Sequence, residues 1–106
     1  GDPQQEERIV ARQLVEEFAM RFEQNHGMRI SFTDAATDLL VRDALESSQS
    51  VRDLCAARFK DFHFGLKLVL QNSGQREFTL DERAVREPDK VLSDWVVASY
   101  RPPQQA

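Results

Sequence analysis

The sequence predicts an α+β fold that is mainly helical, with a short β-sheet beside the helices. Two observations lead to this class. Apolar residues recur with helical spacing over most of the chain, and residues 28–32 and 77–80 alternate with the period of strands. The expected order is helix, strand, helix, helix, strand, helix. The length of 106 residues suits a single hydrophobic core, so we expect one domain over residues 1–106.

The first helix and the first strand are predicted from spacing alone. Between residues 6 and 24, apolar residues recur every four positions, which places them on one helix face. The helix should end near Gly27, because glycine readily takes the left-handed conformation that closes a helix. In residues 28–32, Met28, Ile30 and Phe32 fall on one face of a strand. The helical stripe consists of Val10, Leu14, Phe18 and Phe22, widened by Ile9, Ala11 and Val15.

Two capping side chains mark the next helix starts. Thr33 is predicted to cap a helix over residues 34–46, in which Asp34 is a favourable first-turn anion. Ser50 caps the following helix, with Asp53 three residues later in a capping-box-like relation. An unbroken helical period predicts that this helix continues to residues 72–74. The expected buried residues are Ala36, Leu39, Leu40 and Ala44 in the first of these helices, and Val51, Leu54, Cys55, Phe59, Phe62, Leu66, Val69 and Leu70 in the second.

The segment after Gly74 is expected to hold a second strand and a last helix. Residues 77–80 alternate like a strand, and residues 81–83 form a turn or a helix start. Residues 90–100 include the β-favouring triplet Trp95-Val96-Val97, yet their apolar positions fit helical spacing. We favour a helix there. Residues 101–106 are expected to be a frayed end.

Composition excludes several classes of function. The chain has 14 Lys and Arg against 18 Asp and Glu, a formal charge of −4, so a general attraction to nucleic acid or anionic lipid is not expected and any anion site must be local. The single cysteine excludes an intramolecular disulfide and favours a reducing compartment. With no apolar run near the roughly 18 residues that span a bilayer, we expect a cytoplasmic protein with no membrane partner. A chain that opens with Gly1 rather than Met is expected to be one domain of a longer protein.

Most polar candidates have a structural interpretation. His26 and His63 have no Cys or paired carboxylate at ligand spacing, so no metal site is expected. His63 lies among Phe59, Phe62 and Phe64, which favours a packing role, and the phenylalanines themselves are expected in the core. Cys55 lies on an apolar helix face and is expected to be a buried, inert thiol. The motifs GxxxxGK[ST], GxSxG and HExxH do not occur, so no catalytic residue is predicted.

Arg52 occupies a position that helix formation does not favour. It lies near the second position of the helix capped by Ser50, where a cation opposes the helix dipole by about 0.3 kcal/mol or more. One interpretation is a solvated arginine on an exposed turn. The other is that Arg52 and the backbone N–H groups of the first turn face a phosphate together. Without such a ligand, Arg52 is expected to be exposed and either unpaired or in contact with Asp53.

Residues 13–70 resemble the C-terminal small domain, or lid, of AAA+ ATPases of the Clp and Lon protease class, and are most like ClpX. The family has an aromatic-rich helix end, a strand, a phrase of the form F-T-x-x-A and then G-A-R-x-L or G-V-R-x-L. The matching residues here are Phe18 to Phe22, Ile30 to Phe32, Phe32-Thr33-Asp34-Ala35-Ala36 with Leu39 and Leu40, and Ser50-Val51-Arg52-Asp53-Leu54. Two positions depart from the pattern, because Ser50 replaces the usual glycine and Cys55 replaces a frequent second arginine.

The resemblance implies that Arg52 is a sensor-2 arginine, which reaches ATP phosphates bound by the large domain of the same chain, with Ser50 capping the helix at that site. ATP or ADP with magnesium would be the ligand of the parent protein, an ATP hydrolase, while this segment alone would bind no cofactor and would not be an enzyme. The implied partners are the large AAA+ domain, neighbouring subunits of a homohexamer, unfolded protein substrates and a ClpP-like peptidase. The lid would rotate about a linker near residues 3–7.

A second hypothesis belongs to a different class. The acidic composition and the lack of a catalytic set also suit a stand-alone helical protein-interaction or adaptor module without nucleotide binding. A small DNA-binding domain is disfavoured, because no helix carries clustered Arg and Lys. Within the first hypothesis, the sequence leaves open whether the parent is a chaperone, a Clp-type subunit or a Lon-type fused protease.

Overall fold

The computed structural model describes residues 3–100, and within them the chain forms six helices and two strands. The predicted class is confirmed, since the domain is mainly helical with one short two-stranded sheet. The elements are α1 (Pro3–His26), β1 (Arg29–Phe32), α2 (Asp34–Ser47), α3 (Val51–Arg58), α4 (Phe62–Ser73), β2 (Glu77–Leu80), α5 (Glu82–Arg86) and α6 (Pro88–Tyr100). Residues 3–7, expected on the linker side, belong to α1, and the expected frayed tail at 101–106 lies outside the described residues.

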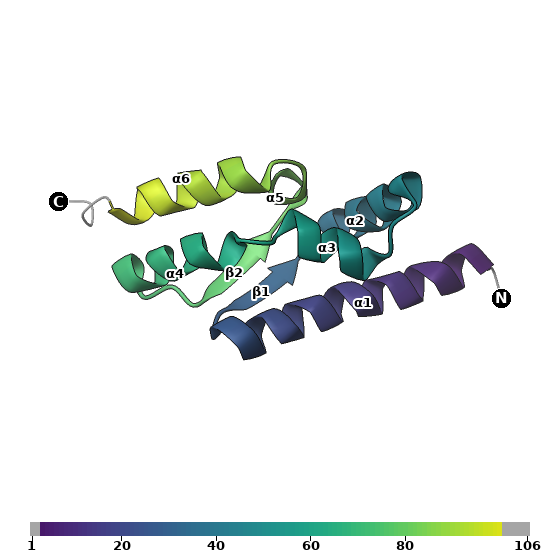
Figure 1. The fold of residues 1–106 in the computed structure, drawn as a ribbon, viewed down its shortest axis with the longest axis horizontal. Helices are drawn as coiled ribbons and strands as arrows, with labels where there is room; N and C mark the ends of the chain where they lie inside the picture. The colour runs from purple at the N-terminus through teal and green to yellow at the C-terminus, as the bar shows by residue number, and fades with distance from the viewer. Residues whose placement is uncertain (1–2, 101–106) are drawn as a thin grey trace.

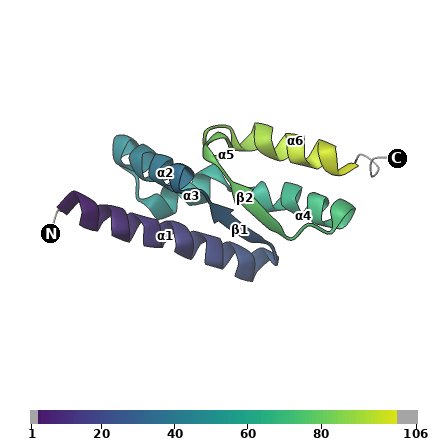
Figure 2. The same cartoon turned by 180° about the vertical axis from the view of Figure 1, so that it is seen from behind.

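The molecule is elongated, with extents of 56 × 24 × 23 Å, and α1 runs along one side of it (Figure 1). The two strands lie near the middle, where β1 and β2 pair in parallel, from Arg29 opposite Glu77 to Phe32 opposite Leu80. At one end, α4 and α6 lie side by side and run in the same direction, while α2 and α3 lie at the other end (Figure 1; Figure 2 from behind). The sheet therefore connects a helical layer around α1 to the pair formed by α4 and α6.

The core contains most of the residues that the sequence placed there. The predicted buried face of α2 is confirmed, and the predicted residues of α3 and α4 are buried except Leu70, which is half-buried. The prediction for α1 is wrong at its first turns, where Ile9 and Val10 are 58% and 55% exposed. The reason is that α1 packs through the line of Ala11, Val15 and Phe22, and this line leaves Ile9 and Val10 toward solvent.

The predicted unbroken helix after Ser50 is also wrong, because α3 ends at Arg58 and α4 begins at Phe62. Phe59 (φ −111°, ψ 28°) and Asp61 (φ −110°, ψ 16°) leave the helical conformation. The apolar period continues through the break, but the two segments pack on different partners: α3 on α1 and α2, and α4 on α6. Phe59 is buried at the bend, with its ring centre 6.0 Å from that of Phe18 and 5.4 Å from that of Phe62. Tertiary packing thus overrides the local periodicity.

The C-terminal segment settles the two alternatives that the sequence left open. The last element is a helix, α6, rather than a strand, and Pro88 occupies its first turn, where proline is well tolerated. Residues 82–86 form the short helix α5 rather than a plain turn, because the side chain of Asp81 accepts the backbone N–H of Ala84 at 3.0 Å. In α4, Gly65 lies against the side chain of Leu92, which allows the two long C-terminal helices to approach closely.

Candidate functional site

The start of α3 has the geometry of a capped helix N-terminus. The Oγ of Ser50 accepts the backbone N–H of Asp53 at 3.0 Å, as the capping pattern predicts. The first helical hydrogen bond runs from the N–H of Leu54 to the carbonyl of Ser50 at 3.0 Å. The N–H groups of Val51 and Arg52 precede this bond and have no acceptor inside the helix. The positive end of the helix dipole is therefore at Arg52.

Arg52 contacts a different residue from the one predicted. Its side chain is 56% exposed, and its Nη2 lies 3.4 Å from Oε1 of Glu17 on α1, so the expectation of either no partner or Asp53 is wrong. The same Glu17 oxygen accepts a shorter bond of 2.7 Å from Nη2 of Arg21, one turn along α1. Long, exposed ion pairs of this kind stabilise a protein by less than about 1 kcal/mol. Arg52 is thus held only weakly by the fold.

Arg52 lines a groove of about 470 Å³ between α1 and α3. Three cationic side chains border it, Arg21, Arg52 and Lys60, against two carboxylates, Glu17 and Asp53. The groove therefore has an excess of positive charge, while the whole chain has a formal charge of −4. The remaining lining residues are Leu14, Phe18, Phe22, Asn25, His26, Ala56, Phe59 and His63.

The two histidines meet at this groove, a contact that no sequence pattern predicts. His26 at the end of α1 and His63 in the first turn of α4 stack with ring centres 4.0 Å apart and planes 11° apart. Burial lowers the pKa of His26, and the nearby charges of His63 and Lys67 lower it further. The packing role predicted for His63 is confirmed in kind, but its neighbours are His26 and Phe64, 4.1 Å away, rather than Phe59 or Phe62.

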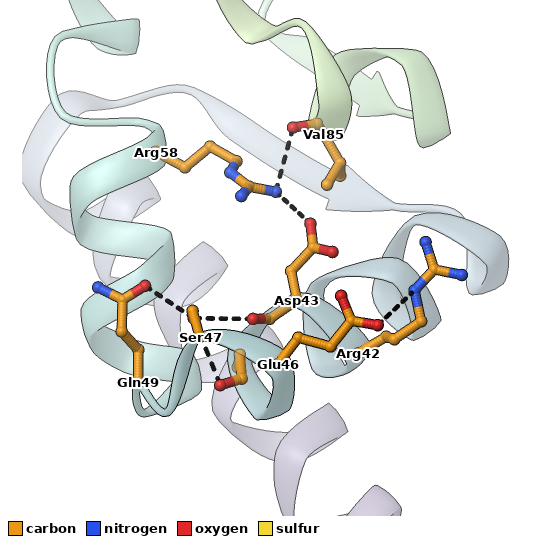
Figure 3. A network of polar contacts seen from close by, with 8 residues as sticks. Arg42, Asp43, Glu46, Ser47, Gln49, Arg58 and Val85 are labelled. Atoms are coloured by element: carbon orange, nitrogen blue, oxygen red, sulfur yellow. Dashed lines mark hydrogen bonds and ion pairs between the residues drawn. The ribbon is translucent and has the colours of Figure 1, made fainter.

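Sequence reasoning missed Arg58, in the last turn of α3. Its Nη1 donates to Oδ2 of Asp43 at 2.7 Å and to the carbonyl of Val85 at 3.3 Å, so it joins α3 to α2 and α5 (Figure 3). Its side chain and that of Asp43 are only 24% and 25% exposed. The sequence carries no signal for this role, because the apolar period continues past Arg58 and predicts a helix interior there. This arginine fixes the position of α3 and with it the site.

Cys55 is completely buried in α3, as predicted. Burial raises the pKa of its thiol to about 11, with Arg58 lowering it slightly, so at neutral pH it is protonated and unreactive.

Across residues 3–100, no group of three or more His, Cys, Asp and Glu side chains is placed to hold a metal ion. In the same range, no helix has both the length and the apolar character needed to cross a membrane.

A scan against protein-family models and searches of the curated proteins and of the solved structures each find no match to this chain. The resemblance of residues 13–70 to AAA+ lid domains therefore stays a prediction.

Proposed function

We propose that this chain is the C-terminal lid domain of an AAA+ ATPase subunit in an ATP-dependent unfoldase or protease, and that Arg52 is its contact to the nucleotide phosphates. The observation that carries the proposal is the state of Arg52. It lies exposed on a capped helix start, and its partner Glu17 is already held more tightly by Arg21. Within residues 3–100, the polar contact of Arg52 is this long pair with Glu17, so we expect the main role of Arg52 to lie in a ligand.

The local electrostatics suit a phosphate held by another domain. The positive helix end and an arginine fork can act on the same anion, and the cationic balance of the groove favours its approach. Releasing Arg52 from Glu17 costs less than about 1 kcal/mol, which one charge-assisted hydrogen bond to a phosphate offsets. An arginine placed this way stabilises the charge that develops in phosphoryl transfer.

The chain would supply one part of the nucleotide site. Its 106 residues contain no phosphate-binding loop, so ATP or ADP with magnesium would be bound by the large domain of the parent protein and the isolated segment would not hydrolyse ATP. The chemistry of the phosphates would belong to that domain, while Arg52 would bind and orient them from the lid. We place the parent in the cytoplasm, where unfolded proteins would be its substrates and a ClpP-like peptidase its partner.

The exposed apolar surface supports packing between subunits of a ring. Val10 of α1 and Leu45 of α2 are 55% and 67% exposed and border a shared groove of about 1310 Å³. Charged side chains, among them Arg8, Asp38 and Arg42, line the same groove, so it offers both apolar and polar contacts to another protein. In the proposed hexamer, this groove would lie against a neighbouring subunit.

The test is the change Arg52→Ala in the full-length protein. We expect a loss of about 100-fold or more in ATPase rate, because removal of one preorganised donor to a developing charge costs roughly that much. The matched control is Arg76→Ala, which removes an exposed arginine outside both grooves and should leave the rate unchanged. Equal rates for the two variants would show that Arg52 has no sensor role. A full-length protein without a GxxxxGK[ST] loop would instead support a stand-alone interaction module.

A further inference from the structure

The chain has two histidines, separated by 37 positions in sequence, and they stack on each other. Their stack is part of a column of four aromatic rings, defined here as Phe22, His26, His63 and Phe64. Successive ring centres along the column are 4.8, 4.0 and 4.1 Å apart. The contact between the histidines is the closest and the most nearly parallel, with 11° between the planes.

The column bridges two helices that otherwise have little contact. Phe22 and His26 belong to α1, and His63 and Phe64 belong to α4. The backbones of α1 and α4 scarcely approach each other, because α1 packs on β1 and α3 while α4 packs on α6. The rings therefore form the side-chain contact that holds the end of α1 to the start of α4, across the bend after Phe59.

Most of the charged side chains around the column are cationic, so they do not stabilise a proton on its histidines. Two carboxylates line the groove: Glu17 is paired with Arg21 and Arg52, and Asp53 lies in the first turn of α3. On β1, Arg29 is bound to Glu23 of α1 and to Glu77. The cations facing the groove or the column are Arg21 of α1, Arg52 of α3, Lys60 of the bend and Lys67 of α4.

We propose that the column of Phe22, His26, His63 and Phe64 is a proton-sensitive latch, which holds the end of α1 to α4 when the imidazole of His26 is neutral and loosens when it is protonated. Two neutral rings stack face to face with favourable dispersion. A proton on His26 would lie against the ring of His63, 4.0 Å away, and near the charge of Lys67, so burial and these neighbours disfavour the protonated form and weaken the stack. This proposal does not depend on nucleotide binding.

The direction of the pH effect follows from proton binding. Burial, His63 and Lys67 lower the pKa of His26 in the folded chain below the value near 6.5 that an unfolded histidine has. Between these two values the unfolded chain binds more protons than the folded chain, so stability rises with pH. The stabilising contribution is complete above about pH 6.5 and is lost as the pH falls toward the lowered pKa. Histidine is the side chain that ordinarily titrates in this range, and the chain has no other histidine.

The experiment compares the chain with its variant His26→Phe/His63→Phe, which keeps four aromatic rings in the column and removes both imidazoles. Thermal unfolding is followed at pH 7.5, 6.5 and 5.5. We expect the midpoint of the original chain to fall by at least about 3 °C more than that of the variant between pH 7.5 and 5.5. Native-state hydrogen exchange at residues 24–27, corrected for intrinsic rates, should speed up at pH 5.5 in the original chain only.

Two outcomes would overturn the proposal. The first is an identical pH profile for the original chain and the double variant. The second comes from the original chain alone, so it holds even if the variant does not fold: an NMR titration that gives His26 a pKa at or above the ordinary value of about 6.5 would exclude a latch that protons open.

Discussion

The two ends of α3 each carry an arginine, and the two arginines differ in exposure, in the length of their ion pairs and in their position on the helix dipole. Arg52, at the positive end of the helix dipole, is 56% exposed and lies 3.4 Å from a carboxylate that another arginine holds. Arg58, at the negative end, is 24% exposed and binds Asp43 at 2.7 Å and the carbonyl of Val85. The dipole opposes the first arginine and favours the second.

This contrast indicates that Arg58 stabilises the fold and that Arg52 contributes little to its stability. Arg58 ties together α2, α3 and α5, so its removal should be felt in the stability of the domain. Arg52 occupies a position that weakens the helix, and its pair with Glu17 is long and exposed. Its removal should therefore change the stability of the domain little. The predictions below test this division by measuring the free energy of unfolding in urea for variants at each end of the helix.

The largest effect is expected from Arg58→Met. This change leaves the carboxylate of Asp43 partly buried without its cation, which we expect to lower the free energy of unfolding by about 2 kcal/mol, below the full cost of breaking a wholly buried pair. The matched control is Arg42→Met on α2, whose pair with Glu46 spans 4.0 Å and is exposed, and which should change stability by less than about 0.5 kcal/mol. Equal small changes for the two variants would mean that Arg58 is no more structural than a surface arginine.

An intermediate effect is expected at the cap that precedes Arg52. Ser50→Ala removes the acceptor for the N–H of Asp53 and should lower the free energy of unfolding by about 1 kcal/mol. Ser50→Gly should cost only about 0.3 kcal/mol, because glycine is itself acceptable as a cap. Ser93→Ala, at an exposed position of α6, is the control for losing a hydroxyl. If Ser50→Ala behaved like Ser93→Ala, the start of α3 would not depend on its cap.

Much of this contrast could be predicted from the sequence, because capping is local. Ser50 and Thr33 were identified as caps from their own positions, and both accept the N–H three residues later. The exposure of Arg52 followed from its polarity and place in the first turn. Its contact with Glu17 could not be predicted from the sequence. The two residues are 35 positions apart, and no local pattern specifies how their helices pack.

The stacking of His26 on His63 could not be predicted from the sequence for the same reason. Nothing near His26 or His63 indicated that the two rings would stack, since only the bend at Phe59 brings the start of α4 to the end of α1. The bend itself interrupts a continuous apolar period, so periodicity alone favoured one long helix. The sequence does not single out Arg58, because the continuous apolar period places it inside one long helix, where an exposed arginine is ordinary.

The smallest effect on stability is expected from Arg52→Ala, and it decides between the two interpretations of this arginine. Loss of the contact with Glu17 is opposed by relief of the unfavourable position on the dipole, so the free energy of unfolding should change by less than about 0.5 kcal/mol in either direction. Raising NaCl from 0.05 to 0.5 M should reduce even this difference. A loss of more than 1 kcal/mol would make Arg52 a structural residue like Arg58 and would remove the reason for assigning it to a ligand. A change near zero, together with a large loss of ATPase rate in the full-length protein, can arise only if the partner that Arg52 serves lies outside this domain.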